Sequence, residues 1–337
     1  MEKATPKISV IVTLYNRTDF ILDALNSVVN QSLDKELYEI IVVTNIDVNF
    51  DRDTEFLGSI KVLKVDKPQV GMKYLKGFKE SRGDIITFLD DDDLYEKERL
   101  SEILKFFDGK KGHIYYHNSF DLIDDNGKRI NSNFRINDQK FSQSTNVLLI
   151  QPKYRLKDLV KAKKIGGDFN MSSIAVSRSI LSNGMVLLSL ASASPDISLF
   201  MESITINSEI FIDSRKLTLY RIKSSSPKTI ELNDNDQSAI KKPQLEAREG
   251  MINFAVSKGN VMTIKYANFE RNDYLVHSEF RQLIKEQSIS RDMIIRRIKK
   301  LPFSKPYLWR YFLAYFVIYL ILLIFPGFIS KQKLASS

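Results

Sequence analysis

The feature that most constrains the fold is an apolar, β-branched run near the start of the chain, Lys7–Leu14 (KISVIVTL). Such a run is typical of a strand that is buried on both faces. A segment with helical periodicity follows at Thr18–Asn30, and its apolar residues share one face: Phe20, Ile21, Ala24, Leu25 and Val28. A strand buried on both faces needs helices to cover it, so this order predicts a layered α/β arrangement.

The alternation continues further along the chain. We expect strands at Glu39–Val43, Ile60–Val65 and Asp84–Leu89, and a helix at Met72–Ser81. Strands that alternate with helices predict an α/β fold with a mainly parallel central sheet. Ligands of such sheets bind outside the carboxyl ends of the strands, so polar residues that follow strands are the first candidates for a site.

An acidic run directly follows the third of these strands: Asp90, Asp91, Asp92 and Asp93. Adjacent carboxylates raise one another's pKa unless a cation neutralises them. In an extended segment Asp90 and Asp92 point to the same side, where they offer two hard oxygen ligands for Mn²⁺ or Mg²⁺. The other interpretation is an exposed acidic turn in which Asp93 caps the next helix. The position at the sheet edge favours a metal site at Asp90 and Asp92.

Other cofactor classes lack their signals. The first strand ends in Tyr15-Asn16-Arg17, without the glycine pattern of a dinucleotide fold or of a phosphate loop. The chain has no cysteine and three scattered histidines. Disulfides, iron–sulfur clusters and zinc–thiolate sites are therefore excluded, and a histidine-based metal site is not indicated.

The distribution of charge excludes a nucleic-acid-binding role. The formal net charge is +9, but residues 285–337 hold ten Lys and Arg against two acids, so the first 284 residues are close to neutral. A nucleic-acid-binding domain would carry its basic residues on the folded body. Here the positive charge lies beside an apolar segment.

That segment, Tyr311–Ile329, has no charged residue in 19 positions, close to the ~20 residues that a membrane-spanning helix needs. It predicts a transmembrane or membrane-embedded helix at 306–330; a buried core helix and a helix lying in one leaflet are the alternatives. Seven Lys and Arg precede it and two follow it, which places the large N-terminal part on the cytoplasmic face of a membrane. Upstream, Ile289–Leu301 has the pattern of a basic amphipathic helix on anionic lipid.

Three stretches together resemble the family 2 glycosyltransferases of the GT-A fold: residues 7–33, the segment 71–83, and GDIITFLDDDDLY at 83–95. In that family an acidic D-x-D motif follows a strand of the form G-[DE]-x-I-x-F-L. Phe120–Ile130 resembles the family's next hairpin, with Asn126-Gly127 as a turn, and Leu217–Ser224 resembles its closing strand. The resemblance covers roughly residues 7–225.

The resemblance implies an inverting glycosyltransferase that uses a nucleotide-diphosphate sugar. It assigns Asp92 to the metal that bridges the donor diphosphate, and Asp90 to the donor ribose or the metal's water shell. Asp196 would be the general base that takes a proton from the acceptor hydroxyl. Further donor contacts are implied at Thr13, Tyr15, Arg17 and Asp91.

Two departures from the family pattern bear on these roles. Relatives have an aspartate pair after the second strand, where this chain has Asn45 and Asp47 as possible substitutes. Relatives also have an E-D pair opening the helix of the base, whereas Pro195 precedes Asp196 here. A helix cap is therefore the alternative role for Asp196.

The sequence predicts four regions: a catalytic domain at 1–225, a helical amphipathic juxtamembrane region at 226–305, the membrane helix at 306–330 and a tail at 331–337. Within the second region we expect helices at Gln237–Lys258, Met262–Asn272 and His277–Gln287, without chemistry of their own.

The anchor favours a membrane-associated acceptor, either a lipid-linked oligosaccharide or a polyprenyl phosphate, with a UDP-, GDP- or dTDP-linked donor. A phosphate acceptor is already ionised and would not need Asp196 as a base. Two other functions stay open. A nucleotidyltransferase is disfavoured because Thr13–Asp19 has no glycine. A catalytically degenerate scaffold of a membrane glycan-assembly complex is suggested by the missing aspartate pair and opposed by Asp90 and Asp92.

Overall fold

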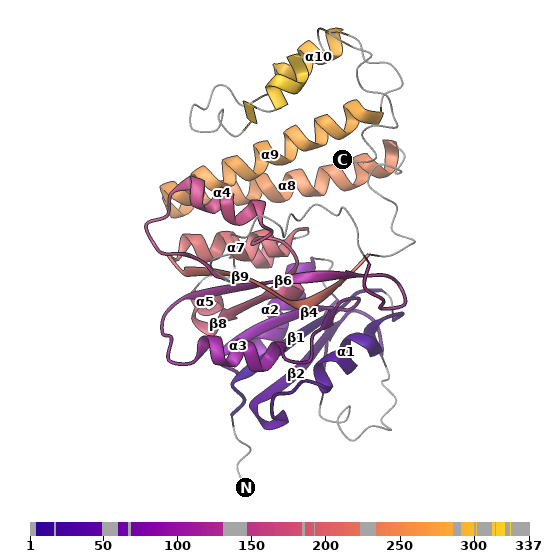
Figure 1. Cartoon of the computed structure of the whole chain (residues 1–337), viewed down its shortest axis with the longest axis vertical. Helices are drawn as coiled ribbons and strands as arrows, with labels where there is room; N and C mark the ends of the chain where they lie inside the picture. The colour runs from indigo at the N-terminus through magenta and orange to yellow at the C-terminus, as the bar shows by residue number, and fades with distance from the viewer. Residues whose placement is uncertain are drawn as a thin grey trace.

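The computed structural model describes residues 5–16, 18–48, 60–66, 69–130, 147–183, 186–191, 193–222, 234–285, 291–299, 301, 312–313, 315–320 and 324. Over these residues one twisted sheet is covered by helices, and two long helices stack above the helices of one face (Figure 1). The predicted α/β class is confirmed.

The strands form a single mixed sheet in the order β3-β2-β1-β4-β8-β6-β9-β5, with β7 also on β9. Their bounds are β1 Ile8–Leu14, β2 Tyr38–Thr44, β3 Lys61–Lys64, β4 Ile85–Asp90, β5 Leu94–Tyr95, β6 Ile114–Ile123, β7 Val147–Ile150, β8 Ile174–Ser177 and β9 Glu209–Arg221. The first four strands in this order are parallel. Strand β8 is antiparallel to both β4 and β6, and β5 and β7 are antiparallel to β9. Strands β6 and β9 are parallel to each other and, because β8 is antiparallel to both β4 and β6, run in the same direction as the first four strands. The predicted mainly parallel arrangement thus holds for β3, β2, β1, β4, β6 and β9, and the sheet is mixed because β5, β7 and β8 run the other way.

The helices connect and cover these strands. Their bounds are α1 Ile21–Val29, α2 Val70–Glu80, α3 Arg99–Phe107, α4 Leu156–Lys164, α5 Arg178–Asn183, α6 Val186–Leu190, α7 Pro195–Thr205, α8 Asp234–Lys258, α9 Val261–Lys285 and α10 Arg291–Ile298. Short 3-10 turns lie at Lys35–Leu37 and Met171–Ser173.

Strand β1 serves two cores because all its residues are buried. Ile8, Val10 and Val12 pack with α1 and α3 on one face of the sheet. Ile11 packs with α2 on the other face, where Tyr74 meets Phe88 of β4 edge to face at 5.4 Å between ring centroids. The alternation of side chains along a strand produces this division.

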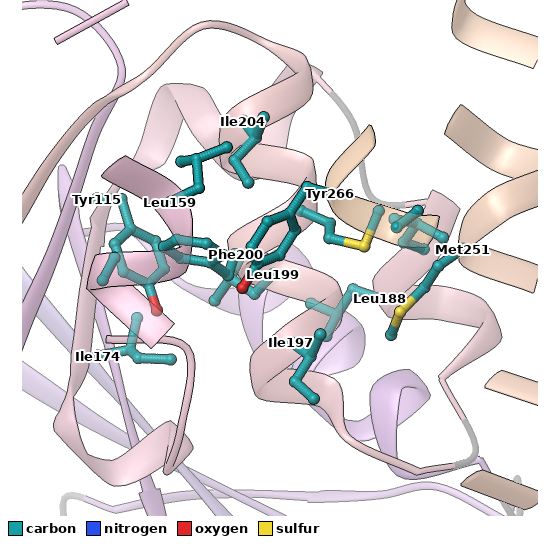
Figure 2. Close-up of a cluster of buried hydrophobic side chains, with 14 of the residues drawn as sticks. Tyr115, Leu159, Ile174, Leu188, Ile197, Leu199, Phe200, Ile204, Met251 and Tyr266 are labelled. Atoms are coloured by element: carbon teal, nitrogen blue, oxygen red, sulfur yellow. The ribbon is translucent and has the colours of Figure 1, made fainter. Parts of the chain in front are cut away.

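The second core runs from the sheet through α7 into α8 and α9. Tyr115 of β6, Phe200 of α7 and Tyr266 of α9 form a row of rings with centroid separations of 5.3 and 5.5 Å, as Figure 2 shows. Helix α7 lies between the sheet and the long helices (Figure 1). Helices α8 and α9 thus pack against the catalytic domain, as their amphipathic pattern predicts, and share one buried cluster with α7 and the sheet.

The predictions for the C-terminal helices are confirmed only in part. Helix α9 is continuous across the break expected after Asn272, and α10 lies within the predicted amphipathic helix. Of the predicted membrane segment the described residues are 312–313, 315–320 and 324; Phe312 is buried and stacks on Phe269 of α9 at 6.0 Å. In the part of the chain that the structure describes, no helix has both the length and the apolar character to cross a bilayer. The predicted membrane helix is not supported there, and its other residues lie outside the described ranges.

Candidate active site

The carboxyl ends of β1 and β4 bring Thr13 and Asp90 side by side. The two residues are direct partners in the parallel register. The Thr13 hydroxyl donates to Oδ1 of Asp90 at 3.1 Å, and the Tyr74 hydroxyl of α2 donates to the same oxygen at 2.6 Å. The backbone N–H of Asp90 donates to Oγ of Ser172 at 3.0 Å. The carboxylate is thus oriented by β1 and α2, and the backbone of Asp90 is held by the turn at Met171–Ser173.

The surroundings of Asp90 disfavour the ionised form of its carboxyl group. Burial raises the pKa of Asp90 to about 6, and Asp92 and Asp91 add to the rise, while the Tyr74 hydroxyl acts against it. A cation at this edge would therefore stabilise the ionised carboxylate.

Asp93 does not cap a helix, because α3 begins only at Arg99. Its Oδ1 accepts from the backbone N–H of Arg221 at 3.0 Å, and burial raises its pKa well above the ordinary value. The Arg221 side chain spans the turn: Nε donates to the carbonyl of Asp92 at 2.7 Å, and Nη1 donates to the carbonyls of Asp124 and Asp125 at 2.9 and 2.8 Å. Arg221 is the last residue of β9, whose sequence was identified as the closing strand without any role for this arginine.

A buried lysine, Lys73, lies among the carboxylates, and no motif in the sequence singled it out. Its Nζ is 3.8 Å from the ring centroid of Tyr15, whose side chain remains half exposed. Burial lowers the pKa of Lys73 to about 8, against the opposing effect of Asp91 and Asp90. The site therefore combines a cation and an accessible aromatic ring with its acidic turn.

The two residues predicted to contact the nucleobase, Asn45 and Asp47, have different surroundings. Asn45 lies beside the end of β1, where its Nδ2 donates to Oδ1 of Asn16 at 2.5 Å and its Oδ1 accepts from the Asn16 N–H at 3.3 Å. Asp47 instead forms an ion pair with Lys64 of β3 at 2.8 Å, with its side chain 92% exposed. Arg17 lies outside the described residues.

Asp196 occupies the first turn of α7, next to Pro195 at the helix start. Its Oδ1 accepts from the backbone N–H of Ile197 at 2.9 Å, and its Oδ2 accepts from that of Asn170 at 3.0 Å. The second bond ties the carboxylate to a different element, which a simple helix cap does not do. Burial raises the pKa of Asp196 to about 6; the two backbone N–H groups and Arg248 oppose this rise.

Two tyrosines join Asp196 to the acidic turn. The pKa of Tyr74, which donates to Asp90, is raised well above its ordinary value by burial first, then by Asp90, with a contribution from Asp196. Tyr220 of β9 also has a raised pKa, from burial and from Asp93, Asp92, Asp90 and Asp196. Asp196 and the acidic turn therefore act electrostatically on the same two tyrosines.

The donor set at the acidic turn suits a divalent ion only in part. Within the described ranges, no group of three or more His, Cys, Asp or Glu side chains is placed to hold a metal. Carboxylates are nevertheless the ligands that Mg²⁺ and Mn²⁺ prefer, and Mg²⁺ sites commonly combine one or two of them with water and substrate phosphates. Asp90 and Asp92 fit a site that a diphosphate completes.

Known proteins resemble this chain in sequence over its N-terminal half. The family model "Glycosyl transferase family 2" matches residues 9–181. An uncharacterized glycosyltransferase of Rickettsia bellii is 34% identical over 156 residues, which is 43% of this chain and 21% of the relative. A poly(ribitol-phosphate) beta-glucosyltransferase of Bacillus spizizenii is 34% identical over 103 residues, 28% of this chain and 16% of the relative. The matched stretches thus span about a fifth of these relatives' length.

Solved structures extend the likeness beyond this half. Staphylococcus aureus TarS 1-349 in complex with UDP-GlcNAc superposes with a TM-score of 0.55 at 15% sequence identity, covering 88% of this chain and 82% of that one. At this identity the likeness concerns the fold, and it supports the predicted GT-A type. The family model spans just over half of the sequence, so the chain belongs to glycosyl transferase family 2, and its prediction as a transferase is confirmed at the level of the family.

Proposed function

We propose that the chain is an inverting glycosyltransferase that moves a sugar from a nucleoside diphosphate sugar to an acceptor at the membrane. The observation that carries the proposal is the placement of two kinds of carboxylate around one site. Asp90 and Asp92 lie at the carboxyl edge of the sheet, and Asp196 lies at the start of α7, with Tyr74 interacting with Asp90 and Asp196. An inverting transfer needs groups that bind the donor diphosphate on one side of the sugar and a base for the acceptor on the other side.

The donor end would lie along the acidic turn. Asp90 and Asp92 would hold Mn²⁺ or Mg²⁺, which when bound supplies the charge that stabilises a departing nucleoside diphosphate. Tyr15 directly precedes Asn16, which is hydrogen-bonded to Asn45, and its half-exposed ring would offer a face to the nucleoside. A UDP-linked donor is the first choice because TarS, a structural neighbour, has been solved with UDP-GlcNAc.

The acceptor end would lie at Asp196. In the reaction the acceptor oxygen forms a bond to the anomeric carbon while the bond from that carbon to the diphosphate oxygen breaks. The electron pair leaves with the nucleoside diphosphate, and the acceptor proton passes to Asp196. With a pKa of about 6, Asp196 is mostly ionised at neutral pH and is still a better base than an ordinary aspartate. Attack opposite the leaving group gives an inverted anomeric centre.

We further propose a lipid-linked or polyprenyl-phosphate acceptor on the cytoplasmic face. The uncharged run at 311–329 and the basic residues before it support this choice. Asp196→Asn distinguishes the two acceptor chemistries. A hydroxyl acceptor needs the base and loses transfer in this variant, whereas a phosphate acceptor is already ionised and retains it.

The test is hydrolysis of UDP-, GDP- and dTDP-linked sugars by the purified chain, with Mn²⁺ or Mg²⁺ and then with EDTA. We expect slow, metal-dependent release of one nucleoside diphosphate, abolished in Asp92→Ala. The matched control is Asp158→Ala, because that carboxylate forms an ion pair with Arg155 on the surface of α4. If a folded chain turns over no donor, and nucleoside diphosphate with Mn²⁺ leaves its melting temperature unchanged, the degenerate-scaffold alternative is supported instead.

A further inference from the structure

We propose that the α8–α9 helix pair is part of the catalytic apparatus, with Gln244 and Arg248 as positioning residues for the carboxylate of Asp196. This inference rests on the proposed role of Asp196 as the base. The helix pair was expected to have no chemistry of its own, but two separate sets of contacts connect it to Asp196.

The first set reaches the N-terminal end of α7. Oε1 of Gln244 accepts from the Ser194 hydroxyl at 2.8 Å and from Nη1 of Arg248 at 2.7 Å. Ser194 precedes Asp196 by two residues and has φ +51°, a conformation that a residue with a side chain adopts at a cost. Its side chain makes no capping bond to α7. The contact with Gln244 therefore holds the backbone turn that aims Asp196.

The second set reaches the loop that binds the other oxygen of Asp196. Asn170, whose N–H donates to Oδ2 of Asp196, has φ +67°. Two residues earlier, Oδ2 of Asp168 accepts from the Tyr266 hydroxyl of α9 at 2.8 Å and from Nζ of Lys163 at 3.5 Å. Helix α9 thus fixes the loop from which Asn170 contacts the base.

Buried charge joins the two sets. Glu270 of α9 is 1% exposed and pairs with Lys163 at 2.7 Å and with Arg248 at 3.8 Å. Arg248 is itself buried, and its guanidinium lies 4.3 Å from the ring centroid of Tyr274. Removing one member of a buried charge network leaves the others without compensation. Arg248 is therefore held in place from both helices.

Apolar packing supports the same contact. Figure 2 shows Met251 of α8 on the side of Leu188 and Ile197, and Tyr266 of α9 beside Phe200. All five belong to one buried cluster. Ile197 directly follows Asp196, so the helix pair packs against the turn of α7 that carries the base.

The charge of Arg248 acts on Asp196 as well. The groups that interact electrostatically with Asp196 are Arg248 from α8, Asp168 from the loop, Tyr74 from α2, Tyr115 from β6 and Tyr220 from β9. Among these described groups Arg248 is the one cation. It lowers the pKa of Asp196, whereas Asp168 raises it. Loss of Arg248 would therefore move the protonation of Asp196 to higher pH.

The experiment compares Gln244→Leu and Arg248→Met with Arg271→Met in the full chain, using release of UDP from UDP-GlcNAc with Mn²⁺ and water as acceptor. Arg271 also bridges the helix pair, through Glu249, and makes no described contact toward Asp196. Since misplacing a reacting group by about 1 Å can cost about 100-fold, we expect kcat to fall by roughly 10- to 100-fold in the two test variants and to change little in the control. The KM for UDP-GlcNAc and the rise in melting temperature caused by UDP stay unchanged.

Two further readouts separate positioning from general destabilisation. In Arg248→Met the acid limb of the pH profile moves to higher pH, whereas in Arg248→Lys it stays in place. In an Asp196→Asn background, Arg248→Met costs less than about 3-fold, because a positioning residue acts only through the group that it positions. Test variants with wild-type kcat, or an equal loss in Arg271→Met, would overturn the inference while leaving the transferase intact. A wild-type chain that neither binds UDP nor releases it from UDP-GlcNAc contradicts the proposed function itself.

Discussion

The hydroxyl of Tyr74 donates a hydrogen bond of 2.6 Å to the same Asp90 oxygen that accepts from Thr13 at 3.1 Å. Tyr74 comes from α2 and Thr13 from β1, so the orientation of this carboxylate is set by the packing of a helix on the sheet. An aspartate that is oriented before the ligand arrives loses little entropy when it binds.

Tyr74→Phe tests this relationship. The variant removes a hydrogen bond to a charged group, worth about 1.5–3 kcal/mol, without changing the shape of the side chain. We expect kcat/KM for the nucleotide sugar to fall by roughly 10- to 100-fold. Thr13→Val removes the longer bond and should cost less. Kinetics of donor hydrolysis measure both variants, and an unchanged kcat/KM in Tyr74→Phe would show that the orientation of Asp90 does not matter.

Arg221→Met should destabilise the fold. The side chain donates to the carbonyls of Asp92, Asp124 and Asp125, and its loss leaves three partly buried acceptors without this donor. We expect the free energy of unfolding to drop by about 2–4 kcal/mol, measured by urea denaturation. Arg129→Met is the matched control because its ion pairs with Glu96 and Asp121 are half exposed and should contribute less than about 1 kcal/mol. Equal losses in the two variants would contradict the role of Arg221.

Lys73→Met should weaken donor binding. The variant removes a buried cation beside Asp90 and Asp91 and leaves the site more negative. A nucleoside diphosphate is an anion, so we expect its Kd to rise about 10-fold, equivalent to about 1.4 kcal/mol. Titration calorimetry with UDP and Mn²⁺ measures the change. Lys76→Met on the same helix serves as control, since Lys76 pairs with Glu80 in solvent; if both variants bind UDP like the wild type, Lys73 makes no contribution.

The first half of the fold could be predicted because its signals are local. A run such as Lys7–Leu14 reveals a strand buried on both faces, and Asp90 follows its strand directly in the sequence. The second half depends on pairing between distant segments. Strand β8, Ile174–Ser177, has four residues, too few for periodicity to show, yet it lies between β4 and β6 and runs antiparallel to both.

The site residues that the sequence did not reveal were missed for the same physical reason. Arg221 acts on carbonyls about a hundred residues earlier in the chain, and Tyr74 acts on Asp90 across a helix–sheet contact. Neither of these hydrogen bonds can be predicted from the spacing of the residues in the sequence. The amphipathic pattern of α8 and α9 predicts that they pack against the catalytic domain, but not which residues they contact, because such a pattern tells which face is apolar and not what covers it. The contact between Tyr266 and Phe200 depends on the tertiary structure, and no local sequence pattern indicates it.

The pH dependence of transfer should report Asp196. The pKa of this residue is raised to about 6, and the residue acts as a base only when ionised. For a hydroxyl acceptor we therefore expect kcat/KM to fall as pH drops through about 6, with a slope of one proton. The profile of donor hydrolysis with water as acceptor measures it, with Asp158→Asn as a surface control. A limb near pH 4, the range of an ordinary aspartate, would show that Asp196 is not the titrating base.

Glu202 should make the stability of the fold depend on pH. Its Oε1 accepts from the backbone N–H groups of Leu187 and Leu188 at 2.7 and 3.3 Å, which ties α6 to α7, and burial raises its pKa from 4.5 to about 8. Between these two values the folded chain binds more protons than the unfolded chain, so the free energy of unfolding decreases as pH rises, by at most about 1.4 kcal/mol per pH unit from this group.

Glu202→Gln keeps the accepting oxygen and removes the titration. We therefore expect the variant to gain stability relative to the wild type as pH rises from about 5 to 8, measured by urea denaturation at each pH. Glu246→Gln, at an exposed position of α8, should run parallel to the wild type. If the free energy of unfolding of Glu202→Gln also changes with pH as that of the wild type does, the carboxyl of Glu202 has the same pKa in the folded and unfolded chains. Its burial would then not raise its pKa.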